Sequence, residues 1–119
     1  IWRWLVEHPS CIWVMDSAYN YMWLYNHMMA LGLEYTKRYG KQHLTIAKLG
    51  DVLRHPPKNA HFNKIGTDAT PAMPEECKIP GDVVGSYRKY YVMKKQRFAT
   101  WKSPSVVPQW WTEALENGI

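Results

Sequence analysis

The sequence predicts an all-α fold: one small helical domain over residues 1–119, with two long helices, one medium helix and a long ordered loop. Two stretches, 17–39 and 83–102, contain no proline and follow a residue suited to cap a helix. A shorter stretch has apolar residues at helical spacing and stops at His55-Pro56-Pro57. A chain of 119 residues is long enough to bury one core.

The first long stretch is expected to be the central helix. Asp16 or Ser17 is suited to cap its N-terminus, and Gly40 is suited to end it in a left-handed conformation. Its apolar residues point in nearly every direction around a helix axis: Met22, Trp23, Leu24, Tyr25, Met28, Met29, Leu31 and Leu33. A helix that is apolar on every side is normally covered by its neighbours, so we expect this helix to be buried.

One narrow line along this helix is polar. Asn20, His27 and Glu34 follow at intervals of seven residues, which places them on one side of a helix. Arg38 lies four residues after Glu34, so the two can form an ordinary surface ion pair. The line is either the solvated side of the helix or a buried polar site. In the second case Glu34, His27 and Arg38 are the candidate catalytic residues, with Glu34 as the acid–base group.

Two shorter helices are expected around the central one. His8-Pro9 breaks the chain, because a residue before proline avoids the helical region, and Ser10 is suited to cap a short helix over 11–15. After Gly40, a medium helix is predicted from His43 or Thr45 to Arg54. It has an apolar stripe expected to pack on one side: Ile46, Leu49, Val52 and Leu53.

Residues 58–81 are expected to form the long loop, because they are rich in turn-forming residues and show no sustained periodicity. A loop of this length is unusual in a compact domain and is often functional. Four apolar residues are expected to hold it against the helices: Phe62, Ile65, Met73 and Ile79.

The second long helix is predicted from Val83 to about Lys102, with Asp82 as its N-cap and Ser103-Pro104 as its stop. It carries an apolar stripe that is expected to pack into the core: Val84, Tyr87, Tyr91, Phe98 and Trp101. A final short helix is expected over 109–116, where Trp110 and Trp111 cannot both face inward.

The net charge of +5 is concentrated in two blocks, residues 34–64 and 82–102, each of which carries +5. The blocks interleave cations with aromatic residues, in a chain that has seven Trp and eight Tyr. Because cations meet phosphates and rings stack on bases, this pattern favours a DNA-binding surface. A solvated basic surface without a partner is the alternative. The candidate DNA-binding residues are Arg88, Lys89, Lys95, Lys102, Lys41, His43 and Trp110.

Other kinds of chemistry have weaker support. The five histidines are scattered, with no pair four residues apart and none beside a cysteine, so neither a metal site nor a cofactor is predicted. Cys11 and Cys77 form no CxxC pattern, no serine sits in a nucleophile elbow, and no glycine spacing matches a phosphate-binding loop. No apolar run is long enough to cross a membrane, and two cysteines are few for a disulfide scaffold, so a cytoplasmic protein is expected.

Several local patterns carry a resemblance to a known family: HPxxxW at 8–13, NYxWL at 20–24, EYxxRYGKxH at 34–43, MPEE at 73–76 and YRKYY…K…WK…PxWW at 87–111. Together they cover nearly the whole chain and resemble a family of uncharacterised proteins encoded by tailed phages and marine bacteria. Members of that family carry further residues at the N-terminus, so this chain is expected to lack an N-terminal segment and, if phage-encoded, to act in the host cytoplasm.

A more distant resemblance reaches the phage pyrimidine-dimer DNA glycosylases. Those are small, basic, all-helical proteins that contact DNA with a C-terminal tail of Tyr, Trp and Lys, which implies a DNA face on the basic aromatic helix of this chain. That family acts through an N-terminal amine and an early glutamate. Neither matches a residue here, so the resemblance transfers no catalytic residue.

Three functions therefore stand open. The first is a phage-type DNA-binding or DNA-processing protein, including a glycosylase-like repair protein. The second is a protein-interaction or structural module that uses exposed tryptophans. The third is a small-molecule enzyme built on Glu34, His27 and Arg38.

Overall fold

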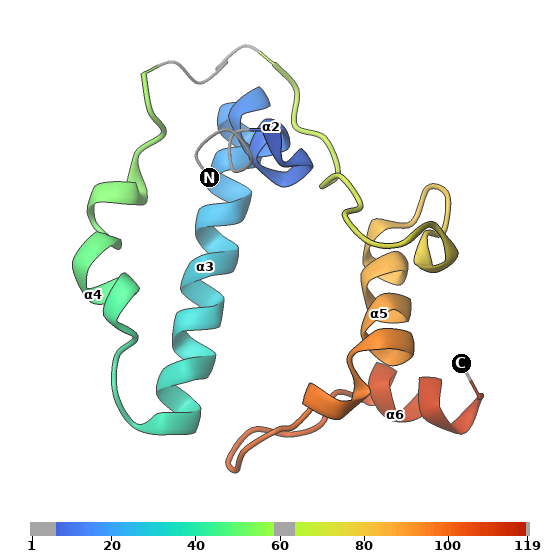
Figure 1. Cartoon of the computed structure of the whole chain (residues 1–119). Helices are drawn as coiled ribbons and strands as arrows, with labels where there is room; N and C mark the ends of the chain where they lie inside the picture. The colour runs from blue at the N-terminus through green and yellow to red at the C-terminus, as the bar shows by residue number, and fades with distance from the viewer. Residues whose placement is uncertain (1–6, 59–63, 119) are drawn as a thin grey trace. The chain divides into compact units, whose positions relative to one another are not determined.

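Helices alone make up the regular secondary structure of residues 7–58 and 64–118, the part of the chain that the computed structural model describes (Figure 1). The α-helices are α2 (Pro9–Asp16), α3 (Ala18–Tyr39), α4 (Leu44–Leu49), α5 (Val83–Lys94) and α6 (Gln109–Glu116). The 3-10 helices are η1 (Val52–Arg54), η2 (Glu75–Cys77) and η3 (Gln96–Phe98). The all-α class is confirmed.

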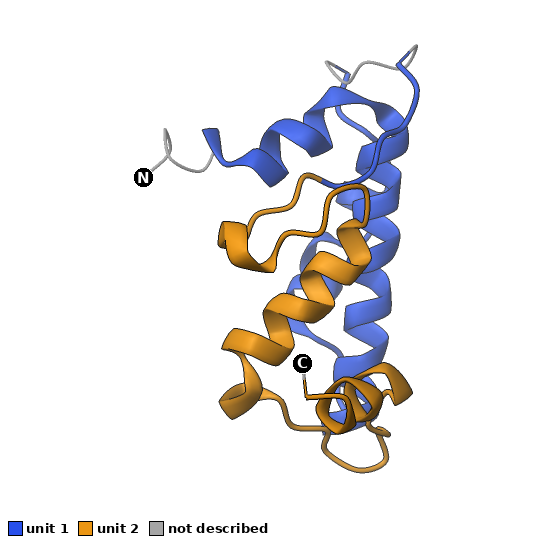
Figure 2. Ribbon diagram, turned by 90° about the vertical axis from the view of Figure 1, so that its right-hand side faces the viewer, with its two compact units in different colours: residues 1–69 blue, residues 70–119 orange. Residues whose placement is uncertain are grey.

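The chain divides into two compact units, which we call unit 1 (residues 1–69) and unit 2 (residues 70–119) (Figure 2). Unit 1 contains α2, α3, α4 and η1, and unit 2 contains η2, α5, η3 and α6. The boundary falls inside the long loop. That the whole chain forms one domain, as its length indicates, stays a prediction.

α3 has 22 residues, and capping residues define both of its ends as predicted. Ser17 is the N-cap, and its hydroxyl oxygen accepts a hydrogen bond from the Asn20 backbone N–H at 3.0 Å. Gly40 ends the helix at φ 70°, a left-handed conformation that suits glycine. Its N–H donates to the Thr36 carbonyl at 2.8 Å. The boundaries of α3 are therefore set locally.

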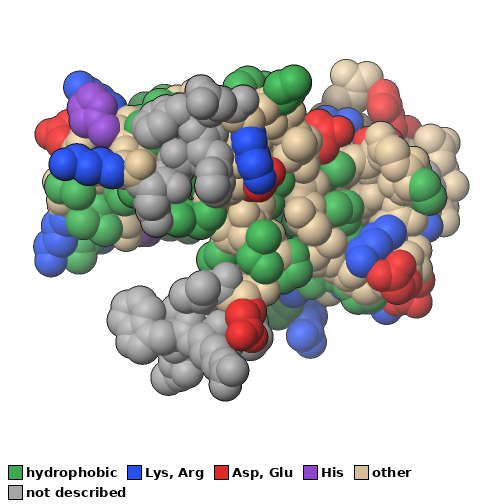
Figure 3. All heavy atoms as spheres, turned by 90° about the horizontal axis from the view of Figure 1, so that it is seen from above, with side chains coloured by type: hydrophobic (Ala, Val, Ile, Leu, Met, Phe, Trp, Pro, Cys, Tyr) green, Lys and Arg blue, Asp and Glu red, His purple; other side chains and the backbone are tan. Residues whose placement is uncertain are grey.

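The expectation that neighbouring elements bury α3 is wrong. Asn20 is fully buried, but Leu33 is 73% exposed and Trp23 is 46% exposed. Seen from above, hydrophobic side chains reach the surface of the molecule in several patches (Figure 3). The cause within unit 1 is length, because α2 has eight residues and α4 has six, too few to cover a helix of 22 residues.

α2 begins earlier than predicted, because Ser10 is not its cap. His8 is the N-cap, and its Nδ1 accepts a hydrogen bond from the Ser10 backbone N–H at 3.1 Å. Pro9 then occupies the first turn, where its fixed φ suits a helix and its missing N–H leaves no donor to satisfy. α2 packs on the start of α3, where the ring of buried Trp13 meets Trp23 edge-on at 5.8 Å.

After α3 the chain turns and runs back beside it (Figure 1). Four contacts tie the returning segment to successive levels of α3: His43 with Tyr35, Ile46 with Gly32, Gly50 with Tyr25 and Leu53 with Tyr21. A Cβ on Gly32 would lie 2.8 Å from Ile46 Cγ1. The missing side chain at position 32 therefore allows α4 to approach the backbone of α3 closely.

The medium helix predicted to reach Arg54 is shorter than expected. α4 ends at Leu49, and only the 3-10 turn η1 follows. The Tyr25 hydroxyl donates to the Gly50 carbonyl at 2.9 Å. In a continuous α-helix that carbonyl would accept the N–H of residue 54, so a tyrosine of α3 occupies an acceptor that the longer helix would use. Val52, expected to pack in the apolar stripe, is exposed.

The predicted loop is confirmed over its described part, 64–81, where η2 is the one helical turn. Of the four apolar residues expected to hold the loop, Met73 is half-buried. Ile65 and Ile79 are exposed, and Phe62 lies outside the described residues. Ile65 is 88% exposed and holds nothing in place. In unit 1 the loop is held by polar contacts of Thr67 instead.

In unit 2, α5 begins as predicted, and the Asp82 carboxylate accepts a hydrogen bond from the Gly85 N–H at 2.8 Å. It ends at Lys94 and not near Lys102, and the 3-10 turn η3 follows. The chain leaves the helix axis, and Trp101 lies against Trp111 of α6 with ring centroids 5.3 Å apart. Packing with α6 therefore overrides the helix propensity of this segment.

The core of unit 2 is formed by η2, α5 and α6. Its buried apolar residues are Cys77, Val92 and Trp111. Ser86 is also buried, and its hydroxyl oxygen accepts a hydrogen bond from the Ile79 N–H at 2.8 Å. Ser86 and Val92 therefore define the inner face of α5.

The aromatic stripe predicted to anchor α5 is wrong for three of its five residues, because Val84, Tyr91 and Phe98 are exposed. Helical spacing does not apply to Phe98, since the α-helix has already ended. Tyr87 and Trp101 do act as anchors. The half-buried Tyr87 accepts a hydrogen bond on its hydroxyl oxygen from the Ala72 N–H at 3.2 Å.

Candidate nucleic-acid interface

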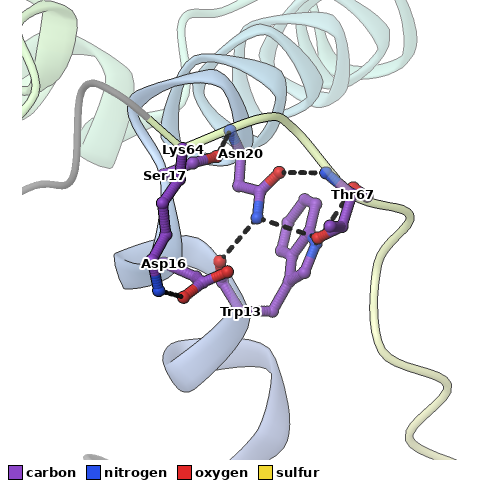
Figure 4. Close-up of polar contacts among 6 residues, drawn as sticks. All are labelled: Trp13, Asp16, Ser17, Asn20, Lys64 and Thr67. Atoms are coloured by element: carbon purple, nitrogen blue, oxygen red, sulfur yellow. Dashed lines mark hydrogen bonds and ion pairs between the residues drawn. The ribbon is translucent and has the colours of Figure 1, made fainter.

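The polar line predicted on α3 begins with a residue that has a structural role. The buried Asn20 amide donates to the Trp13 carbonyl at 2.9 Å and to Thr67 Oγ1 at 3.2 Å, and accepts from the Thr67 N–H at 3.0 Å (Figure 4). The Trp13 indole N–H donates to the same threonine at 3.1 Å. Asn20 therefore holds the loop against α2 and α3 and is satisfied within the fold.

The candidate catalytic residues lie further along α3. His27 is exposed and stacks on Trp23, with ring centroids 5.3 Å apart and 13° between the planes. Glu34 and Arg38 are half-buried and form the predicted ion pair, with 2.9 Å between Oε1 and Nε. His27 and Glu34 are separated by about 10 Å along the helix axis, at 1.5 Å per residue. The carboxylate is therefore oriented by Arg38 and has no imidazole of α3 beside it.

Lys41 and His43, the candidate DNA-binding residues of unit 1, are both exposed in the turn between α3 and α4. His43 caps α4, because its Nδ1 accepts a hydrogen bond from the Thr45 N–H at 3.2 Å. Its ring also meets Tyr35 edge-on at 4.8 Å. The other five candidates belong to unit 2.

Arg88 and Trp110 form a stacked pair in unit 2. The exposed Arg88 guanidinium lies over the half-buried Trp110 ring, 5.2 Å from its centroid. Trp111 is 7% exposed, so one of the two adjacent tryptophans faces inward and the other reaches the surface, as predicted.

An open groove of about 500 Å³ runs between α5 and α6. Arg88 and Lys89 lie on its α5 side, and Trp110 and Glu113 lie on its α6 side. Neither cation belongs to an ion pair between described residues, although Lys89 is near enough to Glu76 for its charge to help lower the pKa of that carboxyl. Arg88 is therefore the cation of this groove that is most available to an anionic ligand.

A second group of cations and rings gathers where α5 ends. We call Tyr90, Tyr91, Lys95, Arg97 and Phe98 the basic aromatic cluster. The Lys95 ammonium lies 5.4 Å from the Tyr90 centroid and 5.9 Å from the Phe98 centroid. The Arg97 guanidinium lies over the same Phe98 ring at 4.6 Å. Tyr90 meets Tyr91 edge-on at 6.1 Å.

The sequence did not predict that Arg97 and Phe98 belong to a surface cluster. Helical spacing assigned Phe98 to the core, whereas its side chain is 64% exposed. No carboxylate of the described residues pairs with Lys95 or Arg97. The available signal was the presence of basic and aromatic residues close together after Lys94, which is independent of where the helix ends.

Two other lysines of unit 2 are engaged with carboxylates. Lys78 pairs with Glu75 and Lys94 pairs with Glu76, each at 2.6 Å. The hydrogen bond from Lys94 and its charge hold the pKa of Glu76 below its usual value, and Glu76 in turn raises the pKa of Lys94. Sequence alone does not separate Lys94 from Lys95, and the fold does. Lys102 is exposed in the segment after η3.

Within residues 7–58 and 64–118, no three His, Cys, Asp or Glu side chains gather closely enough to hold a metal ion. None of the helices described there combines the length and apolarity needed to cross a bilayer. Comparison with protein-family models, with curated proteins and with solved structures finds no match for this chain.

Proposed function

We propose that this chain binds DNA through unit 2, with cations of α5 and η3 contacting phosphates. The observation that carries the proposal is that some cations of unit 2 are paired with carboxylates and others are not. Lys78 and Lys94 are paired with carboxylates, whereas Lys95 and Arg97 lie on exposed aromatic rings. A cation held on a ring keeps its full charge toward an incoming phosphate and is already oriented.

The groove between α5 and α6 adds further support. Arg88 is held by Trp110 beside the groove, and Lys95 follows seven positions later, at the C-cap where α5 ends. Several phosphate contacts along one surface are the common source of affinity in DNA binding. Lys89 and Lys102 extend the same basic region in the proposal.

The more distant resemblance to the phage pyrimidine-dimer DNA glycosylases supports DNA as the partner, because those proteins contact DNA with a C-terminal tail of Tyr, Trp and Lys, and the segment 87–111 contains the same residue types. DNA processing is a narrower form of the proposal, for which no catalytic residue is assigned. An incision assay on damaged duplex DNA tests DNA processing. If no product forms when the DNA is saturated with protein, DNA processing is rejected and DNA binding alone remains proposed.

The decisive experiment compares two double variants by fluorescence anisotropy over a salt titration. Arg88→Ala/Lys95→Ala removes two cations that lie on rings. Lys78→Ala/Lys94→Ala removes two cations that are paired with carboxylates, and it changes the net charge of unit 2 by the same amount. The first pair should lower the slope of log K against log[salt] by about 0.9 per lost contact. The second pair should change the slope much less.

Equal losses in both double variants would show that affinity depends on net charge alone, and the proposed surface would be rejected. Failure of the parent chain to bind DNA at low salt would reject the function itself. Folding of every variant is checked by circular dichroism, since exposed charges contribute little to stability.

A protein-interaction module is the second candidate, and the exposed apolar residues of α3 favour it. Trp23 is 46% exposed on a helix whose Leu31 and Leu33 are exposed as well. Exposed apolar area of this kind is common at protein interfaces. Trp23→Ala should leave the DNA salt slope unchanged under the first proposal. If the parent lacks DNA affinity at every salt concentration, this module becomes the leading function.

A further inference from the structure

We infer that the basic aromatic cluster recognises unpaired bases, so that the chain prefers single-stranded over duplex DNA. This inference rests on the proposed function and names the form of its ligand. The inference follows from the exposed aromatic rings of the cluster and not from the positive charge of the cluster.

Two of the three rings of the cluster, Tyr91 and Phe98, are exposed although aromatic side chains usually bury their area, whereas Tyr90 is half-buried. Phe98 is 64% exposed with two cations already beside it, and Tyr91 is 50% exposed. Burial elsewhere in unit 2 shows that the fold can cover rings, because Trp111 is only 7% exposed. Free ring surface next to cations is the arrangement that single-strand-binding proteins use, where bases stack and phosphates are neutralised.

Two cations lie close to the Phe98 ring. Arg97 lies at 4.6 Å from the Phe98 centroid and Lys95 at 5.9 Å. A base can stack on the exposed surface of Phe98 or on the planar guanidinium of Arg97, which is itself a stacking surface for bases. Neither contact reads the hydrogen-bonding edge of a base, so little sequence preference is expected.

Duplex DNA cannot use these rings in the same way. Its bases are stacked inside the helix and present only their edges in the grooves. A duplex therefore meets the cations of the cluster and leaves the ring faces without a partner. The difference between single strand and duplex isolates the contribution of the rings.

The test uses the whole chain and three labelled probes of equal length, about 12 nucleotides, which is within the span of common single-strand sites. The probes are oligothymidine, an abasic strand with the same phosphates, and a duplex. Oligothymidine should bind between about 5-fold and 150-fold more tightly than the abasic strand, the range expected for stacking of one base.

Variants at one position then assign the effect to the ring. Phe98→Ala should remove the preference for oligothymidine over the abasic strand, and both strands should still bind with salt-dependent affinity, because no cation is lost. Phe98→Trp should retain the preference, and Phe98→Leu, which keeps apolar bulk without a π-face, should lose it. The position is exposed, so the substitutions should leave the helical circular dichroism signal intact.

Equal affinity for oligothymidine, abasic strand and duplex would overturn the inference and leave DNA binding through phosphates in place. Retention of the preference in Phe98→Leu would also overturn it. Absence of binding to all three probes at low salt would overturn the proposed function together with the inference.

Discussion

Asn20 and Thr67 are 47 residues apart in the sequence, and each donates a hydrogen bond to the other. The Thr67 N–H donates to Asn20 Oδ1 at 3.0 Å, and Asn20 Nδ2 donates to Thr67 Oγ1 at 3.2 Å. Trp13 joins the pair through its carbonyl and its indole N–H. Each of these contacts lies within unit 1, so the beginning of the long loop is part of its fold (Figure 4).

Asn20→Ala should therefore be among the most destabilising single substitutions in unit 1. It leaves the Trp13 carbonyl without its partner in a buried site and the Thr67 N–H without its partner in a partly buried one. An unpaired buried group costs about 1–3 kcal/mol, so a loss of about that size is expected in urea unfolding. Thr67→Ser keeps the accepting oxygen and should cost little, whereas Thr67→Val removes it. Near-equal stability of the two Thr67 variants would contradict the role assigned to this hydroxyl.

The ion pair between Glu76 and Lys94 makes a pH-dependent contribution to the stability of unit 2. The folded pKa of Glu76 is lowered by the hydrogen bond from Lys94, so the contribution is present above the unfolded pKa of a glutamate, about 4.3. It is lost as the pH falls through the lower folded value. The pKa of Lys94 is raised, so its contribution is lost only as the pH rises through its folded value.

Carboxyl NMR titration measures this directly. Glu76 should titrate below an ordinary glutamate in the parent chain, and Lys94→Ala should return its pKa toward the ordinary value. Lys95→Ala is the matched control, since Lys95 lies on aromatic rings and not on Glu76. A shift of the Glu76 pKa in the control as large as that in Lys94→Ala would show general charge effects instead of a specific pair.

The parts of the fold that the sequence predicts well are those that depend on local chemistry. Ser17 and Gly40 end α3 through contacts within a few residues, and both were identifiable from residue type. The end of α5 depends on Trp101 packing against Trp111, a contact across a segment that has no strong periodicity. Periodicity therefore extended this helix too far.

In the candidate site, too, the sequence predicts some features and not others. The positions of the cations were evident, but their partners were not, because Lys94 is engaged by Glu76 from a turn that precedes α5. Phe98 was assigned to the core by a helical spacing that ends four residues before it. The basic aromatic cluster depends on where α5 ends, and helical periodicity does not determine that end.

Trp110 and Trp111 should separate binding from stability although they are neighbours in the chain. Trp111 is 7% exposed and contacts Trp101 at 5.3 Å, so Trp111→Ala should cost about 3–5 kcal/mol of stability by leaving a cavity in the core. Trp110 is half-buried and lies under Arg88. Trp110→Ala should cost less in urea unfolding and weaken DNA binding, because Arg88 loses the ring that holds it.

The control for this pair is Trp110→Phe, which keeps an aromatic face beneath the guanidinium and should restore most of the affinity. DNA binding is measured without urea, at a salt concentration where all the variants give the same helical circular dichroism signal. If Trp110→Ala binds DNA as tightly as the parent chain, the stacked pair does not position Arg88 for phosphate. The basic aromatic cluster at the end of α5 would then carry the binding alone.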